Sequence, residues 1–202
     1  MIYLDNSATT RLDEEVLDAM LPWLRDGFGN ASSIYKLGRE ARVAVEQART
    51  EVAHLIGAHP AEITFTSGGT EANNTILKSS ITESHLADAI AVGATEHHAV
   101  LAPAEELARR GTPCTILPVD ALGRIDLDAV RALNTPRTLI SVMHANNETG
   151  AIQPLAAIRA AAPDVLLHSD AVQSLGKIPV RVDEMGVDFL SMSAHKIHGP
   201  KG

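Results

Sequence analysis

The stretch TLISVMHANNETG, residues 138–150, combines two properties that together decide the fold. Its first part, residues 138–144, is a mostly apolar run without regular alternation of polar and apolar residues. Runs of this kind are typical of strands in a parallel sheet that helices cover on both faces. Its last part, residues 146–150, is polar or glycine and follows the run after Ala145. The stretch therefore predicts a buried strand whose carboxyl end carries groups able to do chemistry.

Similar runs recur along the chain and alternate with helical patterns. The clearest helix is predicted at about 37–56, where apolar residues recur at three- and four-residue steps and Gly57 occupies the position of a C-terminal cap. The alternation, with right-handed crossovers, predicts an α/β fold with a mainly parallel, doubly wound sheet. The other predicted strands are 63–66, 89–94, 114–119, 165–168 and 187–193, and the other predicted helices are 72–77, 100–110, 127–133 and 155–161.

The composition excludes several classes of protein. The 202 residues are 45 % hydrophobic and 21 % charged, which is ordinary for a globular domain. The net charge of −8 and the lack of any basic run longer than two arginines argue against nucleic-acid or anionic-membrane partners. A single cysteine, Cys114, leaves no disulfide framework and no CxxC motif. We find neither a signal-peptide pattern nor an apolar run of membrane-spanning length, which predicts a cytoplasmic location and no membrane partner.

Polar residues follow five of the six predicted strands. Because ligands of open α/β sheets bind beyond the carboxyl ends of the strands, we expect these residues to form one site. The five groups are Ser67–Glu71, Glu96–His98, Asn146–Gly150, Asp170–Gln173 and His195–Lys196.

The glycine-rich stretch Ser67-Gly68-Gly69-Thr70 has two interpretations. It resembles a phosphate cradle, in which glycines let backbone N–H groups approach an anion at a helix N-terminus. It could equally be a plain strand-to-helix turn capped by Ser67 or Thr70. The stretch lacks a Walker lysine and the pattern GxGxxG, so an NTPase or a dinucleotide site has little support.

Three further side chains also have two interpretations each. Asp170 could cap a helix that begins at Ala171, or it could bind the protonated ring nitrogen of a heteroaromatic cofactor. His97 could be a helix cap or a core histidine, or it could stack on a flat ligand; a metal role lacks a matching carboxylate set. Lys196 could be a solvated terminal charge, but a predicted buried strand precedes it, and a desolvated lysine is a nucleophile toward carbonyls.

A phosphate cradle, a carboxylate for a ring nitrogen, a stacking imidazole and an amine nucleophile together describe one ligand, pyridoxal 5′-phosphate (PLP). The motifs that carry these groups also resemble, in order and over the whole chain, those of cysteine desulfurases of the NifS and IscS type. These are class V, fold-type I PLP enzymes. The matching motifs are Tyr3–Thr10, Phe65–Glu71, Thr95–His97, His144–Gly150, His168–Ser174 and Ser193–Gly202.

The resemblance implies a domain plan and a role for each matching residue. Residues 16–202 would be a PLP-dependent transferase-like large domain, residues 1–15 would belong to the small-domain side, and the C-terminal small domain would be absent. Lys196 would bind the cofactor covalently and move the substrate's Cα proton, while His97 would stack on the ring and assist proton transfer. Asp170 would bind the ring nitrogen. Asn147 and Gln173 would hold the ring's O3′, and the phosphate ligands would be Gly69, Thr70, Ser193 and His195.

The resemblance also implies an activity. Such enzymes convert L-cysteine to L-alanine and leave a persulfide on the enzyme, which passes to an iron–sulfur scaffold or a thiolation protein, and they are homodimers. Two other class V activities, selenocysteine lyase and cysteine sulfinate lyase, remain open, as does a non-catalytic interaction module.

Two elements of such enzymes have no counterpart in this chain. Relatives carry an arginine for the substrate carboxylate and a nucleophilic loop cysteine, and both lie in a part that this chain lacks. Cys114 begins a predicted strand away from the motif-bearing ends, where a cysteine acts as a small hydrophobe. We therefore expect the cofactor-binding, N-terminal half of an enzyme, with negligible turnover by itself.

Overall fold

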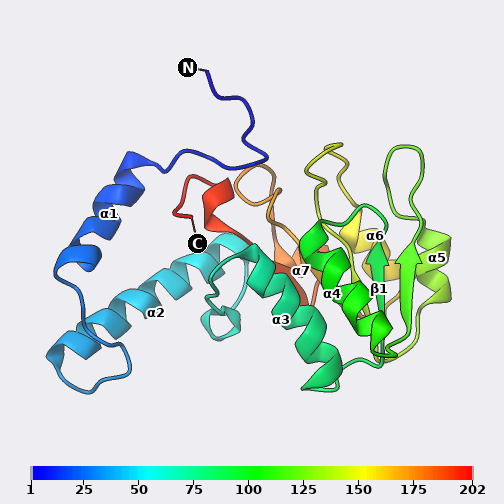
Figure 1. Ribbon diagram of the computed structural model, residues 1–202, viewed down its shortest axis with the longest axis horizontal. Helices are drawn as coiled ribbons and strands as arrows, with labels where there is room; N and C mark the ends of the chain where they lie inside the picture. The colour runs from blue at the N-terminus through cyan, green and yellow to red at the C-terminus, as the bar shows by residue number, and fades with distance from the viewer. Residues whose placement is uncertain (1, 202) are drawn as a thin grey trace. The chain divides into compact units, whose positions relative to one another are not determined.

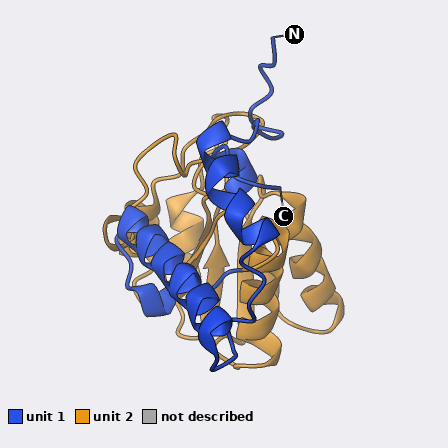
Figure 2. Cartoon of the chain, turned by 90° about the vertical axis from the view of Figure 1, so that its left-hand side faces the viewer, with its two compact units in different colours: residues 1–65, 194–202 blue, residues 66–193 orange. Residues whose placement is uncertain are grey.

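The computed structural model describes residues 2–201 and divides into two compact units. Unit 1 comprises Met1–Phe65 together with Ala194–Gly202, and unit 2 comprises Thr66–Ser193 (Figure 2). Each unit is described by itself below.

Unit 2 contains a five-stranded sheet in the order β2-β1-β3-β4-β5, and every neighbouring pair of strands is parallel. This confirms the predicted parallel α/β architecture. Because parallel strands need a crossover connection, each strand is followed by a helix before the next one begins. The strands are β1 Ala89–Gly93, β2 Cys114–Leu117, β3 Thr138–Ser141, β4 Leu166–Asp170 and β5 Phe189–Ser191.

The helices of unit 2 form two groups. Helices α3 and α4 pack on each other; α4 contacts β1 and β2, and α3 contacts β4 and β5. Figure 1 shows α3 and α4 in front of the sheet, with α6 behind it. In the second group α5 packs on α6, and α6 packs on α7. The bounds are α3 Gly69–Thr82, α4 His98–Arg109, α5 Leu127–Ala132, α6 Leu155–Ala161 and α7 Val182–Met185.

The core lies where the α3–α4 layer meets the sheet. All four residues of β3 are buried, as the mostly apolar run of this strand predicts. The largest buried side chains of this core are Leu77, Ile90, Val92, Val100, Leu107 and Leu139.

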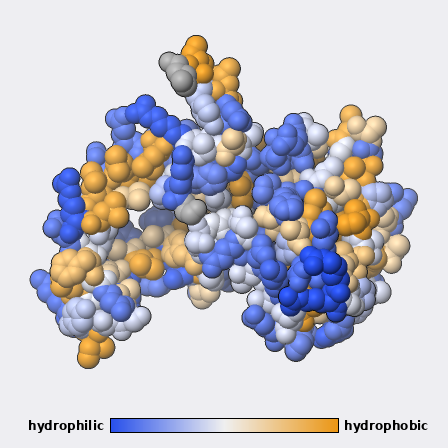
Figure 3. Space-filling view, viewed as in Figure 1, coloured by the Kyte–Doolittle hydropathy of each residue, from blue (hydrophilic) through white to orange (hydrophobic). Residues whose placement is uncertain are grey.

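Unit 1 is helical. Helix α2, Lys36–Ile56, ends at Gly57 in the left-handed conformation (φ 74°), which confirms the predicted helix and its cap. Helix α1, Glu14–Arg25, was not predicted, although Asp13 accepts a hydrogen bond from the backbone N–H of Glu15 and so marks its start. None of the residues of α1 is buried, and Figure 3 shows apolar surface where Figure 1 draws this helix. The short 3-10 helices η1, Pro60–Glu62, and η2, Ala194–Lys196, complete the unit.

One predicted element is wrong, and so is one of the two interpretations of Asp170, namely that it caps a helix that begins at Ala171. Residues 63–66 are not a strand: Ile63 is extended (φ −89°, ψ 126°), but its carbonyl accepts a hydrogen bond from Arg49 rather than from a strand. Within residues 2–201 no strand pairs with this segment, and a strand requires such a partner. Residues after Asp170 form successive turns, with Ser174 N–H donating to Ala171 O at 3.1 Å, rather than a helix. The predicted strands 114–119, 138–144 and 187–193 are each shorter in the structure.

Among the helices described, those of residues 2–201, none is both long enough and apolar enough to cross a membrane.

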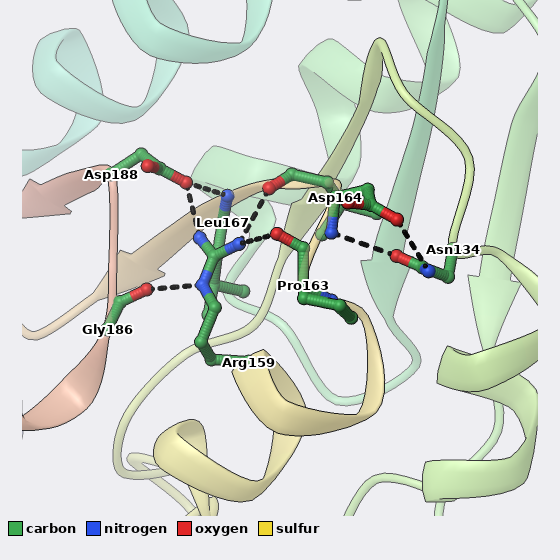
Figure 4. A network of polar contacts seen from close by, with 8 residues as sticks. Asn134, Arg159, Pro163, Asp164, Leu167, Gly186 and Asp188 are labelled. Atoms are coloured by element: carbon green, nitrogen blue, oxygen red, sulfur yellow. Dashed lines mark hydrogen bonds and ion pairs between the residues drawn. The ribbon is translucent and has the colours of Figure 1, made fainter.

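Arg159 links its own helix, α6, to the start of β4 and to the turn before β5 in unit 2 (Figure 4). Its guanidinium donates to the carbonyls of Gly186, at 2.7 Å, and Val165, at 2.8 Å, and pairs with the Asp188 carboxylate. Asp188 in turn accepts the backbone N–H of Leu167 at 2.7 Å. Gly186 has φ 67°, and a Cβ there would lie 2.9 Å from Arg159 Cγ, so glycine is needed on both counts. The network fixes the start of β4 and the turn before β5.

We predict that Arg159→Ala lowers the free energy of unfolding by about 2–4 kcal/mol, because it leaves backbone carbonyls and a carboxylate without their donor. Denaturant unfolding measures this loss. The control is Arg131→Ala, which removes a solvent-exposed pair with Asp128 on α5 and should change little. Equal effects of the two substitutions would contradict the assigned role of the network.

A fully buried histidine bridges three neighbouring strands. His168 on β4 has no exposed surface; its Nδ1 lies 2.8 Å from Ser141 Oγ of β3, and its Nε2 lies 3.0 Å from Ser191 Oγ of β5. Burial lowers the pKa of His168 from 6.5 to about 3, so the ring is neutral at physiological pH. A neutral imidazole has one donor and one acceptor nitrogen, and serine hydroxyls can complement both.

We predict that His168 makes the stability of the fold depend on pH. Because its pKa is lower in the folded chain than in the unfolded chain, the unfolded chain binds more protons between pH 6.5 and about 3. The stabilisation is complete above pH 6.5 and decreases on acidification, by about 1.4 kcal/mol per pH unit. Urea unfolding of wild type and His168→Gln at pH 7 and pH 5 measures it. The variant should lose this part of the slope, and an unchanged slope would rule the assignment out.

Candidate functional site

The parallel sheet brings polar residues to one edge of unit 2. Since all five strands run in the same direction, their carboxyl ends lie at the same edge. The polar residues that follow these ends are Glu96 and His97 after β1, Asn146 and Asn147 after β3, Asp170 at the end of β4, and Ser193 after β5.

Asp170 is held on both of its carboxylate oxygens. It is 5 % exposed; Oδ2 accepts a hydrogen bond from Asn73 Nδ2 at 2.7 Å, and Oδ1 accepts the backbone N–H of Val172 at 2.9 Å. The contact with Val172 N–H shows that Asp170 caps a turn, although no helix follows. Two donors that fix a buried carboxylate in one orientation leave it well suited to bind a cation of defined geometry.

Asn73 is a site residue that the sequence analysis missed. It is 1 % exposed, lies on α3, and its Oδ1 has no hydrogen-bond partner among residues 2–201. Its position three residues after Thr70 and four after Gly69 places it on the same face of α3 as those two residues. That spacing within the motif Gly-Thr-Glu-Ala-Asn was the available signal.

His97 is confirmed as a helix cap. It is the N-cap of α4, and its Nδ1 accepts the backbone N–H of Ala99 at 3.0 Å. Because Nδ1 is the acceptor, the proton of the neutral ring is on Nε2. The cap uses the edge of the ring and not its faces, so it is compatible with stacking on a flat ligand.

The two adjacent asparagines after β3 have different environments. Asn146 is buried; its Nδ2 donates to Thr95 O at 2.8 Å and its Oδ1 accepts the N–H groups of Glu148 and Thr149 at 2.9 and 2.8 Å. These bonds shape the turn. Asn147 is half-buried and donates to Glu148 Oε1 at 2.8 Å. The structure therefore assigns the turn to Asn146 and leaves Asn147 as the asparagine suited to a ligand.

The N-terminus of α3 has no side-chain cap. The N-cap residue is Gly68, so the second interpretation of this stretch, a turn capped by Ser67 or Thr70, is not the one that the structure shows. Instead, the Glu71 carboxylate accepts the backbone N–H of Ser67 at 2.6 Å, and hydrogen bonding by Ser67 lowers the pKa of Glu71. An uncapped helix N-terminus presents N–H groups and a positive dipole end to an anion.

Gly69 and Ser193 lie next to each other. A Cβ built on Gly69 would lie 3.6 Å from Ser193 Cβ and 3.0 Å from Val172 Cγ2. The backbone of α3 therefore approaches the segment after β5 closely, which a side chain at residue 69 would hinder.

Gln173, in the turn after Asp170, is half-buried and accepts a hydrogen bond from Lys177 Nζ at 2.9 Å.

Lys196 and His195 belong to unit 1, where the N-terminal segment holds them. Lys196 is half-buried, and its Nζ donates to the backbone carbonyls of Ser7 and Ala8, the latter at 2.9 Å. His195 Nδ1 lies 3.1 Å from Thr9 Oγ1, and its carbonyl accepts the N–H of Thr10 at 2.9 Å. Burial, followed by the charges of Lys196 and Lys201, lowers the pKa of His195. Lys196 is thus engaged with the chain and is not a solvated terminal charge.

Cys114 lies at the opposite edge of the sheet from the candidate site. It is the first residue of β2, so it occupies the amino end of an edge strand. Burial and, to a lesser degree, Glu105 raise the pKa of its thiol. A protonated thiol is a weak nucleophile, which agrees with the expectation that Cys114 is not catalytic.

An open parallel α/β sheet with a fixed buried carboxylate and an uncapped helix N-terminus at its carboxyl edge is typical of proteins that bind a phosphorylated, cationic ligand there. The chain belongs to the aminotransferase class-V family, whose model matches residues 2–202.

Its relatives agree with the resemblance. The chain is 50 % identical to a cysteine desulfurase IscS of Dictyoglomus turgidum and 49 % identical to a cysteine desulfurase of Bradyrhizobium diazoefficiens, each over 205 residues. Both alignments cover 100 % of this chain and 52 % of the relative, so the chain spans about half the length of these curated relatives. The similarity to cysteine desulfurases of the NifS and IscS type is thereby confirmed.

Solved structures give the same result. A NifS-like protein superposes with a TM-score of 0.93 at 41 % identity, covering 100 % of this chain and 57 % of its own. The structure described as SspA in complex with cysteine superposes with a TM-score of 0.94 at 37 % identity, covering 100 % of this chain and 59 % of its own.

We predict that Asn73→Asp destabilises the fold by about 3 kcal/mol or more at neutral pH, because it places a second carboxylate against buried Asp170. The loss should shrink on acidification, when one of the two carboxylates takes up a proton. Denaturant unfolding between pH 8 and pH 5 measures it. Thr75→Asp, at an exposed position of the same helix, is the control and should show no such recovery.

Proposed function

We propose that this chain is the cofactor-binding part of a PLP-dependent cysteine desulfurase. The observation that carries the proposal is Asp170, a carboxylate buried at the carboxyl end of a parallel strand with both oxygens held by donors. The names of the most similar relatives support the same reaction.

The residues of unit 2 fit PLP in their chemistry. A fixed, buried carboxylate suits a protonated pyridine nitrogen, because it keeps the ring cationic. The uncapped N-terminus of α3, with Gly69 in its first turn, suits a phosphate group, since backbone N–H groups can approach the anion without a side chain between them. His97, with its ring held by the α4 cap, suits stacking on a planar ring.

The motif match proposes the remaining roles residue by residue. Lys196 would bind the aldehyde carbon of the cofactor through Nζ. Asn147 and Gln173 would hold the ring's O3′, Asp170 its nitrogen, and His97 one of its faces. The phosphate ligands would be Gly69, Thr70, Ser193 and His195.

When bound, PLP supplies an electron sink for the bond that breaks at the substrate's Cα. The residues of this chain then have separate tasks. Asp170 would keep the ring nitrogen protonated, and Asn73, which donates to Asp170 Oδ2, would keep that carboxylate in place. Lys196 would move the substrate's Cα proton, for which it needs a neutral amine, whereas the carbonyls of Ser7 and Ala8 that accept from its Nζ favour the charged form. His97 carries a proton on Nε2 that it can donate.

The properties of the whole protein follow as further proposals. Residues 1–15 would belong to a small domain and residues 16–202 to the large domain of a cytoplasmic homodimer. L-cysteine would be the substrate, in line with the complex of SspA with cysteine, and a scaffold or thiolation protein would accept the sulfur. A selenocysteine or cysteine sulfinate lyase would use the same cofactor residues, and a non-catalytic module is the alternative outside enzymes.

The decisive experiment is to incubate the chain with PLP and follow visible absorbance, then trap the adduct with borohydride and locate it by mass spectrometry. We expect a single adduct at Lys196. Lys196→Ala should abolish it, whereas Lys78→Ala, which removes an exposed lysine of α3, should leave it intact. A wild-type chain with no adduct under saturating PLP would overturn the proposal. With L-cysteine added, we expect negligible sulfide release from the 202-residue chain, and sulfide release at the rate of complete enzymes would contradict this.

A further inference from the structure

Glu96 is a buried glutamate to which the proposed function gives no role. It lies between the end of β1 and the first residue of α4, immediately before His97, and is 7 % exposed. Among residues 2–201 no other glutamate is buried. Glutamate is rarely buried without a paired charge, so its presence at this edge of the sheet calls for a physical explanation.

One carboxyl oxygen of Glu96 links the ends of two strands. Oε1 accepts the backbone N–H of Met143, two residues beyond β3, at 2.6 Å. Next to it, Thr95 O accepts Asn146 Nδ2 at 2.8 Å. The segment after β1 is therefore joined to the segment after β3 at two adjacent points. A Cβ at Gly93 would lie 2.9 Å from Glu96 Oε1, so the glycine leaves the space that this carboxyl group occupies.

The surroundings of Glu96 disfavour a negative charge. Its second oxygen, Oε2, is buried and has no hydrogen-bond partner within the described residues, and no cation of residues 2–201 forms an ion pair with Glu96. Burial first, and then the charge of Asp170, raise the pKa of Glu96 well above its ordinary value, and the Met143 N–H opposes this only in part. Each of these features favours the protonated form of the carboxyl group over its ionised form.

We propose that Glu96 is a neutral carboxylic acid that holds the ends of β1 and β3 together, positions His97, and leaves Asp170 as the buried carboxylate of the site. The link to Met143 fixes the residue directly before the His97 cap. An ionised Glu96 would instead add a second negative charge near Asp170 and compete with it for a ring cation. The benefit of a single negative charge, carried by Asp170, depends on the proposed function. The neutral state of Glu96 does not depend on that function.

Infrared spectroscopy of the cofactor-free chain tests the protonation state directly. Of the 25 acidic residues, those in solvent are ionised at pH 7 and give no protonated-carboxyl C=O band. We expect wild type to show such a band, and we expect carboxyl-¹³C labelling of glutamate to shift it. Glu96→Gln should remove the band, and the control Glu105→Gln, at an exposed position of α4, should keep it.

Binding of PLP, followed by absorbance titration, tests the positioning role. Because glutamine is neutral and keeps an acceptor for Met143 N–H, Glu96→Gln should bind PLP within about twofold of wild type. Glu96→Ala removes the link and should weaken binding by about tenfold or more. If Glu96→Ala does not fold, the infrared band and the glutamine variant still decide the question.

Two outcomes overturn the proposal: a wild-type chain without the labelled band, or a Glu96→Gln variant that loses as much PLP affinity as Glu96→Ala. A chain that shows the band and yet binds no PLP in wild-type form would overturn the proposed function while supporting the neutral state of Glu96. The two ideas can therefore fail separately.

Discussion

The parallel pairing of five strands is the constraint on which the rest of unit 2 depends. Two parallel neighbours cannot be joined by a tight turn, so the chain crosses back through a helix each time, and the helices cover both faces of the sheet. The same pairing directs every strand toward one edge. Glu96, Asn147 and Asp170, which are far apart in the sequence, follow neighbouring strands and share that edge.

Burial acts on three ionisable groups near this edge, and the fold deals with each in a different way. His168 loses its charge and is held as a neutral ring between two serines. Asp170 is supplied with two donors, one from a side chain and one from the backbone. Glu96 has one donor and a nearby negative charge, and both its burial and that charge raise its pKa and so favour its protonated form. Desolvation disfavours a negative charge on both Asp170 and Glu96. The two carboxyl groups differ in role because they receive different numbers of hydrogen-bond donors.

Local hydrogen bonds decide which of two similar neighbours is suited to a ligand. Asn146 is used by the turn after β3, and Asn147 beside it is not. In unit 1 the N-terminal segment, which carries the first motif of the chain, supplies backbone carbonyls to Lys196 and a hydroxyl to His195. The first motif therefore helps to hold residues of the last motif. Short motifs that read as separate features in the sequence therefore act together in the folded chain.

The sequence by itself determined the α/β class, the extent of helices such as α2 with its Gly57 cap, and the polar residues that follow the strands. These depend on hydrophobic periodicity and on caps, which are local properties of the chain. Only the tertiary structure decided that residues 63–66 stay unpaired within the described chain, that Asn73 orients Asp170, and that Glu96 is buried without a cation. Strand pairing, burial and charge are set by residues distant in the sequence, and no local pattern records them.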